Sequence, residues 1–191
     1  MTEIRNVCVY GLEQSIKRSA LPMMSSFSDD NNLTENDIVR AHKLAKNMPG
    51  TGHNNFLKGI IVQFDIKYPE YLSPEMQRYH WFEIVSSMSK MHRLTKMDIG
   101  SSVNKYVDPT IIEILRQYVN NYNQDPCYEN FMKVLSNCPL GLEKWMSITT
   151  NYLQLKTIYF QRKNHKLKED WGAIINMIEN LPYSKLITEY N

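Results

Sequence analysis

Three features that narrow the class of a protein are scarce in this sequence: paired cysteines, long apolar runs and an excess of one charge. The three cysteines, Cys8, Cys127 and Cys138, are odd in number and widely spaced, without a Cys-x-x-Cys pair. Neither a disulfide framework nor a thiolate zinc or redox site is therefore expected, and reduced thiols in a cytoplasm fit best. Because no stretch of about eighteen uncharged apolar residues occurs, we expect no transmembrane helix.

The N-terminal Met-Thr-Glu-Ile-Arg has no basic start followed by an apolar run, so no secretory signal is predicted. The 22 Lys and Arg and the 20 Asp and Glu leave a net charge of +2. This balance does not identify a nucleic-acid binder, and it argues against a DNA mimic, which would be strongly acidic. The sequence thus predicts a cytoplasmic protein. The kind of partner has to be inferred from local groups of charged residues.

The short signatures of several enzyme classes are also absent. The sequence contains no P-loop, no Gly-x-Gly-x-x-Gly, no His-Glu-x-x-His and no Gly-x-Ser-x-Gly. The five histidines do not show metal-ligand spacing, so we expect no metal site. They are His42, His53, His80, His92 and His165.

What is present is the composition of an ordinary globular protein. The chain has 191 residues, of which 42% are hydrophobic and 22% charged, enough for one substantial core and short for two. No repeat, low-complexity tract or linker divides it. We predict a single α/β domain over residues 1–191, with a small sheet packed against several helices.

Two strands are predicted from the apolar pattern. Residues 4–10 place Val7, Cys8 and Val9 together without alternation, as in a strand covered on both faces. Residues 56–68 alternate in their second half, which predicts one outward face there. The polar residues 25–32 predict a loop or mobile segment.

Helix starts are marked by capping residues. Thr34 and Asp37 resemble a capping box, and Ser73-Pro74-Glu75 combines a cap residue with a proline and an early acid. The expected helices are 35–48, 73 to about 90, one from Asp108, one from Asp125, 142 to about 163, and 168 to about 180.

Two groups of polar side chains are candidates for chemistry. The first lies on the expected helix 73–90 and its exit: Arg78, His80, Glu83, Ser86, Ser87, Lys90, His92 and Arg93. A solvated helix face explains any one of them, whereas their density favours an anion or nucleotide site. The three-residue stripe Met76, Tyr79, Phe82, Val85 and Met88 is better explained as core than as a cofactor site. His53, after a glycine-rich turn, is either a surface turn histidine or a functional one.

The second group is the most basic short window of the chain, residues 161–168. It could contact phosphate by charge-assisted hydrogen bonds, or be a solvated helix end. Tyr152, Tyr159 and Phe160 lie close by and are better explained as core than as a stacking surface for nucleic acid.

Parts of both groups resemble the flavin-dependent thymidylate synthases. Gly52-His53, the strand with Phe64 and the Gln77-Arg78-Tyr79-His80 element with its following serines look like the central part of that family. Residues 150–162, with Arg162 eleven positions after Asn151, are similar to its late helix. Departures are present: the family's Arg-His-Arg is Arg78-Tyr79-His80 here, and the arginine expected near Asn151 falls on Leu153.

The resemblance implies a thymidylate-synthase-like fold of the flavin-dependent type, and self-association, because that family builds its sites at subunit interfaces. It also implies FAD as the cofactor and a nucleotide as the ligand. The residues that match the family's flavin positions are His53, Arg78, His80, Asn151 and Arg162; those that match its nucleotide positions are Ser87, Ser89 and Arg93. We expect both sets to meet in a pocket between the helical stretch from Arg78 to Arg93 and the helix from Asn151 to Arg162. The catalytic residues stay open.

Three functions follow as hypotheses. The first is a nucleotide-binding member of this fold that has lost catalysis. The second is an active enzyme, whose reaction would be reductive methylation of deoxyuridylate. Through residues 86–93 and 150–165, the chain also resembles an uncharacterised family of phage and prophage proteins of similar length. This resemblance implies a bacterial host cell and a third hypothesis: a counter-defence protein. It would inhibit a CRISPR nuclease or bind a signalling nucleotide, contacting a host defence protein or nucleic acid through the basic helix end. The residues expected there are Arg162, Lys163, His165 and Lys166.

Overall fold

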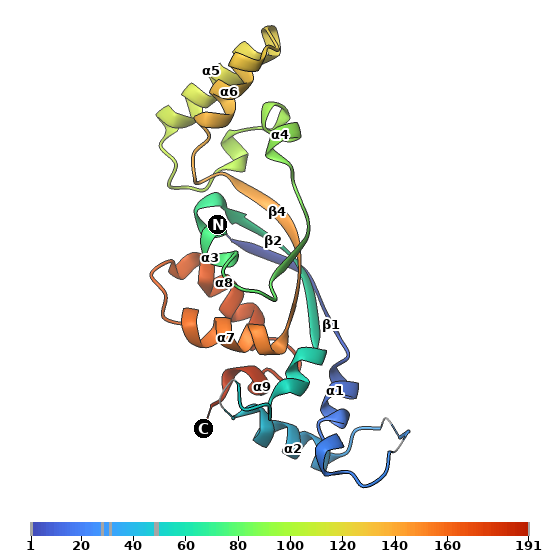
Figure 1. Ribbon diagram of the computed structural model, residues 1–191. Coiled ribbons are helices and arrows are strands. Elements are labelled where there is room, and N and C mark those ends of the chain that lie inside the picture. The colour runs from blue at the N-terminus through green and yellow to red at the C-terminus, as the bar shows by residue number, and fades with distance from the viewer. Residues whose placement is uncertain (1, 28, 31, 48–49, 191) are drawn as a thin grey trace.

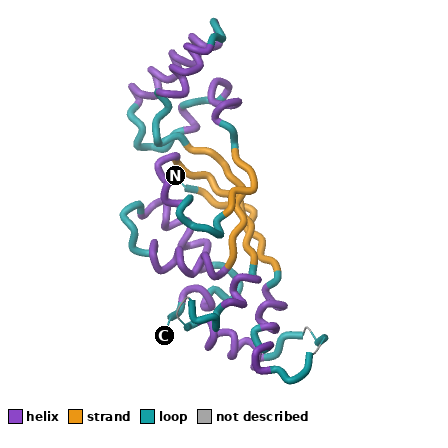
Figure 2. Tube along the Cα trace, in the orientation of Figure 1, coloured by secondary structure: helices purple, strands orange, loops and turns teal. Residues whose placement is uncertain are grey.

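A four-stranded antiparallel sheet forms the centre of the chain, as the computed structural model shows (Figures 1 and 2). The structure describes residues 2–27, 29–30, 32–47 and 50–190. The strands are β1 (Glu3–Tyr10), β2 (Ile61–Pro69), β3 (Glu83–Ser87) and β4 (Glu143–Asn151), in the order β1-β2-β4-β3. The two edges of the sheet are therefore β1 and β3.

Helices lie along one face of this sheet and beyond both of its ends (Figure 1). The α-helices are α1 (Leu12–Arg18), α2 (Glu35–Ala45), α3 (Ser73–Met76), α4 (Lys90–Arg93), α5 (Pro109–Gln124), α6 (Tyr128–Ser136), α7 (Tyr152–Arg162), α8 (Lys168–Glu179) and α9 (Lys185–Thr188). Short 3-10 turns cover Leu21–Met23, Asn55–Gly59, Glu70–Leu72, Leu94–Lys96 and Gly100–Ser102.

One face of the sheet is covered and the other is open. On β2, Val62, Phe64 and Ile66 are at most 2% exposed and pack in one core with residues of α7 and α8. Their neighbours Gln63 and Asp65 point to the opposite face, because side chains alternate along a strand. The alternation predicted for this strand is confirmed, although residues 55–59 form a 3-10 turn and the strand starts at Ile61.

A second, smaller core lies at the end of the sheet where α5 and α6 extend away from it (Figure 1). It joins Leu94 and Ile99 to α5, α6 and Leu142. α1, α2 and α9 lie at the other end. The described part of the chain is therefore elongated along the strands, with a helical group beyond each end.

The strand at residues 4–10 forms, but the prediction that it is covered on both faces is wrong. β1 is an edge strand whose residues 5–8 are all exposed. Its register with β2 shifts between Arg5 and Cys8, and Asn6 takes a positive φ of 53°. The unalternating Val7-Cys8-Val9 thus reflects a β-bulge rather than burial on two sides.

The prediction of one long helix from Ser73 is also wrong. α3 ends at Met76; Tyr79 N then donates to Met76 O and Phe82 N to Tyr79 O, at 3.2 and 3.3 Å. These two three-residue turns bury Tyr79 and Phe82, which explains the stripe with a step of three. The prediction that the stripe belongs to the core is confirmed for these residues. It is wrong for Val85, which is 61% exposed in β3.

The single helix predicted over residues 142–163 is two elements. β4 occupies residues 143–151, where Met146, Ile148 and Thr150 are buried at a period of two. Asn151 then begins α7, because its side-chain oxygen accepts from Gln154 N at 2.9 Å. An aromatic-rich strand and an aromatic-rich helix joined without a loop give the apolar pattern of one long helix.

The other helices agree with expectation in kind. The capping box of Thr34 and Asp37 is present at the start of α2, and α8 matches the helix predicted from Lys168. α5 and α6 follow the two Asp-Pro signals, with α6 beginning later, at Tyr128. Residues 48 and 49, where α2 was expected to end, lie outside the described residues; α2 ends at Ala45.

Candidate functional site

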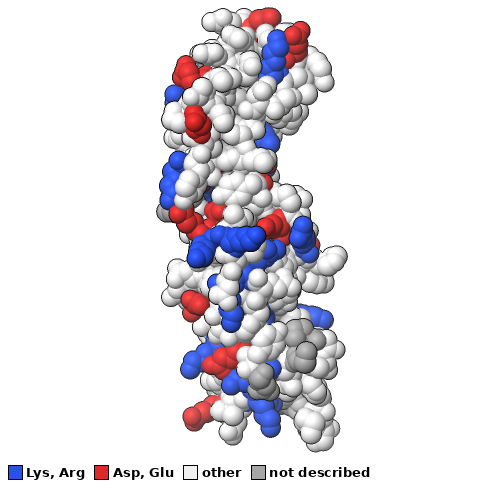
Figure 3. Space-filling model, turned by 90° about the vertical axis from the view of Figure 1, so that its left-hand side faces the viewer, with Lys and Arg blue, Asp and Glu red and all other residues white. Residues whose placement is uncertain are grey.

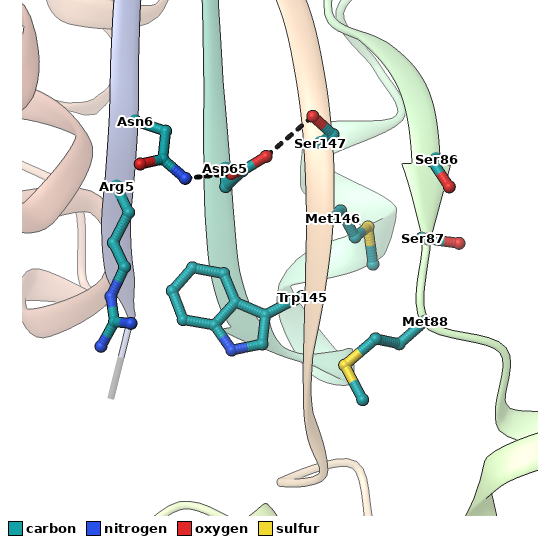
Figure 4. A pocket seen from close by; sticks show the side chains of 9 residues that line it. All are labelled: Arg5, Asn6, Asp65, Ser86, Ser87, Met88, Trp145, Met146 and Ser147. Atoms are coloured by element: carbon teal, nitrogen blue, oxygen red, sulfur yellow. Dashed lines mark hydrogen bonds between the residues drawn. The ribbon is translucent and has the colours of Figure 1, made fainter.

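A groove of about 440 Å³ lies on the open face of the sheet (Figure 4). A row of side chains crosses all four strands there, since Arg5 pairs in register with Asp65, Asp65 with Ser147, and Ser147 with Ser86. The groove is lined by Arg5, Asn6, Asp65, Ser86, Ser87, Met88, Trp145, Met146 and Ser147. We call it the open-face groove.

The carboxylate of Asp65 is fixed at the middle of this row. Asn6 Nδ2 donates to Asp65 Oδ2 at 2.7 Å, and Ser147 Oγ donates to Asp65 Oδ1 at 2.8 Å. The bulge in β1 turns Asn6 toward Asp65 (Figure 4). Hydrogen bonds from Asn6 and then Ser147 lower the pKa of Asp65, so the group is ionised at neutral pH.

Trp145 gives the groove a flat aromatic wall. The guanidinium of Arg5 lies 5.0 Å from the ring centroid and the ammonium of Lys67 5.9 Å from it. Arg5 Nε also donates to Glu3 at 2.6 Å, which holds the guanidinium beside the ring. An aromatic face next to an exposed guanidinium suits a ring that carries a phosphate.

The third side of the groove comes from β3 and the residue after it. A register shift between Ile84 and Ser86 brings Ser86 and Ser87 to the groove, and Met88 N donates to Trp145 O at 3.0 Å. Both serines are exposed, and no hydrogen bond within the described residues engages either hydroxyl. Each can donate and accept toward a ligand.

Of the residues lining this groove, the sequence marked Ser86 and Ser87 as candidates and matched only Ser87 to a nucleotide position. Arg5, Trp145 and Ser147 were missed: Ser147 and Trp145 were assigned to a helix, and Arg5 to a covered strand. The outward alternation of residues 63–67 was the one available signal, because it placed Asp65 on an exposed face.

The other two residues matched to a nucleotide lie beyond the groove. Ser89 caps α4, its Oγ accepting from His92 N at 3.3 Å. Arg93 is exposed at the last position of α4. β3 runs from Glu83, opposite Thr149, to Ser87, opposite Met146, and so carries the chain away from α7 toward α4.

The residues matched to flavin lie elsewhere. Arg162 Nε donates to Tyr79 Oη at 2.7 Å, and Arg162 Nη1 pairs with Glu75 at 3.0 Å. Its guanidinium also lies 4.6 Å from the Trp171 ring centroid. Residues 77–80 therefore lie next to α7, as expected. The guanidinium of Arg162, however, is bound by Tyr79 and Glu75 of the same chain.

The remaining flavin positions do not converge. Asn151 is 5% exposed and caps α7, whereas Arg78 and His80 are exposed on the turns after α3. His53 is exposed in the turn before the 3-10 segment at residue 55, and it lines another hollow together with Phe56. The described residues thus form no shared pocket for Arg93 and Arg162, because α4 and α7 lie at opposite ends of β3 (Figure 1).

The basic helix end forms a corner between α7 and α8. A hollow of about 430 Å³ there is lined by Arg162, Lys163, Asn164, His165, Lys168, Trp171, Gly172 and Ile175. Lys166 lines a neighbouring hollow. Figure 3 looks onto the side of the molecule where this corner lies, and Lys and Arg side chains gather across the middle of that face. We call this region the basic corner.

Neither a metal-binding cluster nor a membrane-spanning helix occurs among the described residues. They contain no group of three or more His, Cys, Asp or Glu side chains arranged to hold a metal ion. None of the described helices has the length and apolar character needed to cross a bilayer.

Comparison with known proteins identifies the fold. No family model matches the sequence, and no curated protein matches it either. Two solved structures of flavin-dependent thymidylate synthase from Helicobacter pylori, each complexed with FAD and dUMP, resemble the chain along nearly its whole length. The first has 15% identity, a TM-score of 0.73 and coverage of 96% of this chain and 98% of its own. The second has 14% identity, a TM-score of 0.75 and coverage of 98% and 97%. The chain has the α/β fold of the flavin-dependent thymidylate synthases, as predicted.

Proposed function

We propose that this protein binds a nucleotide in the open-face groove, as a relative of the flavin-dependent thymidylate synthases. The fold supports a nucleotide ligand, because both similar structures were solved with dUMP. The observation that carries the proposal is the composition of the groove: an aromatic wall at Trp145, a guanidinium at Arg5 and the unengaged hydroxyls of Ser86 and Ser87.

These groups divide the recognition of a nucleotide. The base stacks on Trp145, the phosphate takes charge-assisted hydrogen bonds from Arg5, and the serine hydroxyls meet the polar edge of the base or the sugar. Arg5 is exposed, and it is held by a surface ion pair with Glu3 and by the face of Trp145. Both are weak contacts at an exposed site, so Arg5 reorients toward a phosphate at little cost.

FAD is less well matched by the residues of one chain. Of the five flavin positions, Asn151 is used as a helix cap and Arg162 is bound to Glu75 and Tyr79. His53, Arg78 and His80 are exposed and apart from the open-face groove. A flavin site on these residues needs a second copy of the chain to complete it. We therefore propose self-association as the condition for flavin binding, and assign no reaction step to FAD.

The test is titration calorimetry of dUMP, dCMP and FAD with the wild type and with Trp145→Ala, Arg5→Ala and Arg116→Ala. Loss of base stacking, worth about 1–3 kcal/mol, should weaken nucleotide binding by at least about fivefold in Trp145→Ala. Arg116, on α5, is the matched exposed control and should leave affinity unchanged. Absence of nucleotide binding by the wild type, or equal affinity in all four proteins, would refute the groove as the site.

The active enzyme and the counter-defence inhibitor are the alternatives. A flavin absorbance spectrum of the purified protein separates them: bound flavin supports the enzyme. For the inhibitor, the supporting observation is the basic corner with its exposed Lys163 and Lys166. A colourless protein that forms a complex with a nuclease, and loses it in a Lys163→Ala, Lys166→Ala double variant, would favour inhibition over nucleotide binding.

A further inference from the structure

The carboxylate of Asp65 is a charged group in the open-face groove whose hydrogen bonds within the described residues come from neutral groups alone. Its two hydrogen bonds come from the Asn6 amide and the Ser147 hydroxyl. Arg5, its partner in register on β1, turns instead to Glu3 and Trp145. None of the ion pairs among the described residues includes Asp65.

An ionised carboxylate with these partners has a defined preference. Each carboxylate oxygen keeps a lone pair after accepting one hydrogen bond, so Asp65 can accept further N–H groups. The single hydroxyl hydrogen of Ser147 is used by Asp65 and is not offered to a ligand. A ligand atom placed against Asp65 is therefore favoured as a donor, and a carbonyl oxygen there is repelled.

Bases differ in what they present at this position. Cytosine, adenine and guanine carry an exocyclic amino group, which donates, beside a ring nitrogen. Uracil and thymine carry a carbonyl oxygen where cytosine has its amino group, and carboxylate side chains read this difference in cytosine. In the row of side chains that pair in register, Ser86 lies on β3, two strands away from Asp65 on β2. The Ser86 hydroxyl can therefore form a hydrogen bond to a second atom of the same ligand.

We propose that Asp65 selects the base of the nucleotide bound in the open-face groove, favouring bases with an exocyclic amino group over uracil and thymine. This inference rests on the proposed nucleotide-binding function and narrows its ligand class. It also separates this chain from its two similar structures, which hold dUMP. Asn6 and Ser147 are positioning residues, because they fix the carboxylate without having to touch the ligand.

The experiment uses dCMP and dUMP as a matched ligand pair, because they differ only at positions 3 and 4 of the base: cytosine has an unprotonated N3 and a 4-amino group, and uracil has an N3–H and a 4-carbonyl group. Calorimetry on the wild type should give dCMP an affinity roughly tenfold higher than dUMP. In Asp65→Asn, whose amide can donate to a carbonyl, the ratio should fall to about one or invert. Asp98→Asn, an exposed aspartate whose side chain is 65% accessible, should keep the wild-type ratio.

The outcomes separate the two proposals. If neither nucleotide binds to the wild type, the nucleotide-binding function fails and the selection by Asp65 fails with it. If both bind with equal affinity, or if Asp65→Asn keeps the wild-type ratio, only the selection is overturned. Trp145→Ala should weaken both ligands by the same factor, which shows that the base occupies this groove. Thermal unfolding of Asp65→Asn checks that the variant is folded, and Asn6→Ala gives a second test through a reduced dCMP to dUMP ratio.

Discussion

The two faces of the sheet use the same strands for different purposes. On β2, Val62, Phe64 and Ile66 are buried against α7 and α8, whereas Gln63 and Asp65 face the open side. The covered side gains from the removal of apolar area from water, at about 25 cal/mol per Å². The open side keeps its polar groups in reach of solvent or ligand. Adjacent residues of one strand therefore differ in whether substitution should change folding or binding.

The largest expected effect is on the covered face. Phe64→Ala removes a ring that is 2% exposed and packs edge-on against Phe82, with centroids 5.9 Å apart. The cavity and lost burial should reduce the free energy of unfolding by about 3–5 kcal/mol. Gln63→Ala, one residue away on the open face, should change it by less than about 0.5 kcal/mol. Urea denaturation of both variants measures the difference, and similar losses would contradict the division of the two faces.

Arg162 tests whether a residue matched to the ligand belongs to the fold instead. Its side chain is 12% exposed and pairs with Glu75, which also accepts from Trp171 Nε1 at 2.9 Å. Arg162→Ala leaves Glu75 and Tyr79 without this donor and should cost about 2–3 kcal/mol of unfolding free energy. The neighbouring Lys163→Ala, at an exposed position, should cost less than about 0.5 kcal/mol. Unchanged stability of Arg162→Ala together with weaker nucleotide binding would instead return Arg162 to the ligand site.

Burial of Lys156 on the covered side should make the free energy of unfolding depend on pH. It is fully buried in α7, where its amine donates to Glu189 O at 2.6 Å and Leu186 O at 3.4 Å and lies 4.3 Å from the Tyr190 ring centroid. Desolvation by burial lowers the pKa of Lys156 to about 8; the charge of Glu189 opposes this shift and that of Lys46 adds to it.

The direction in which stability changes with pH follows from proton binding. Between pH 8 and the ordinary lysine pKa, the unfolded chain holds a proton at Lys156 that the folded chain has released, so stability rises with pH. From pH 7 to 9.5 the wild type should gain about 2 kcal/mol relative to Lys156→Met, which lacks this titration. Denaturation of both proteins at the two pH values makes the comparison, in which other titrating groups cancel. A gain of the same size in Lys156→Met would assign it to other residues.

The sequence predicted the fold class and much of the covered side. The helix start at Asp108-Pro109, the capping box at Thr34 and the outward turn of residues 63–67 were readable because each depends on a few neighbouring residues. Assignments failed where a period of two and a period of 3.6 overlap. Residues 143–162 read as one helix because a strand and a helix meet at Asn151 without a loop.

The open-face groove could not be predicted in the same way. Its row joins Arg5, Asp65, Ser147 and Ser86, which are far apart in the chain and meet only through strand register. The bulge that directs Asn6 to Asp65 has no strong local signal, since Val7-Cys8-Val9 reads as a buried run. The family resemblance led to the correct fold, yet of its nucleotide positions only Ser87 lines this groove.

The smallest expected effect is that of a substitution in the row of side chains on the open face. Ser147→Ala removes one of the two donors to Asp65, at the position next to the fully buried Ile148. Because the carboxylate is within reach of water and keeps its bond from Asn6, the loss of stability should be below about 1 kcal/mol. The pKa of Asp65 should rise toward its ordinary value, and more so in Asn6→Ala, since Asn6 is the larger cause of the shift. Titration of the Asp65 carboxyl signal by NMR in both variants checks this order. A larger loss of stability in Ser147→Ala than in Ile148→Ala would mean that the open face holds the sheet together as much as the covered face does.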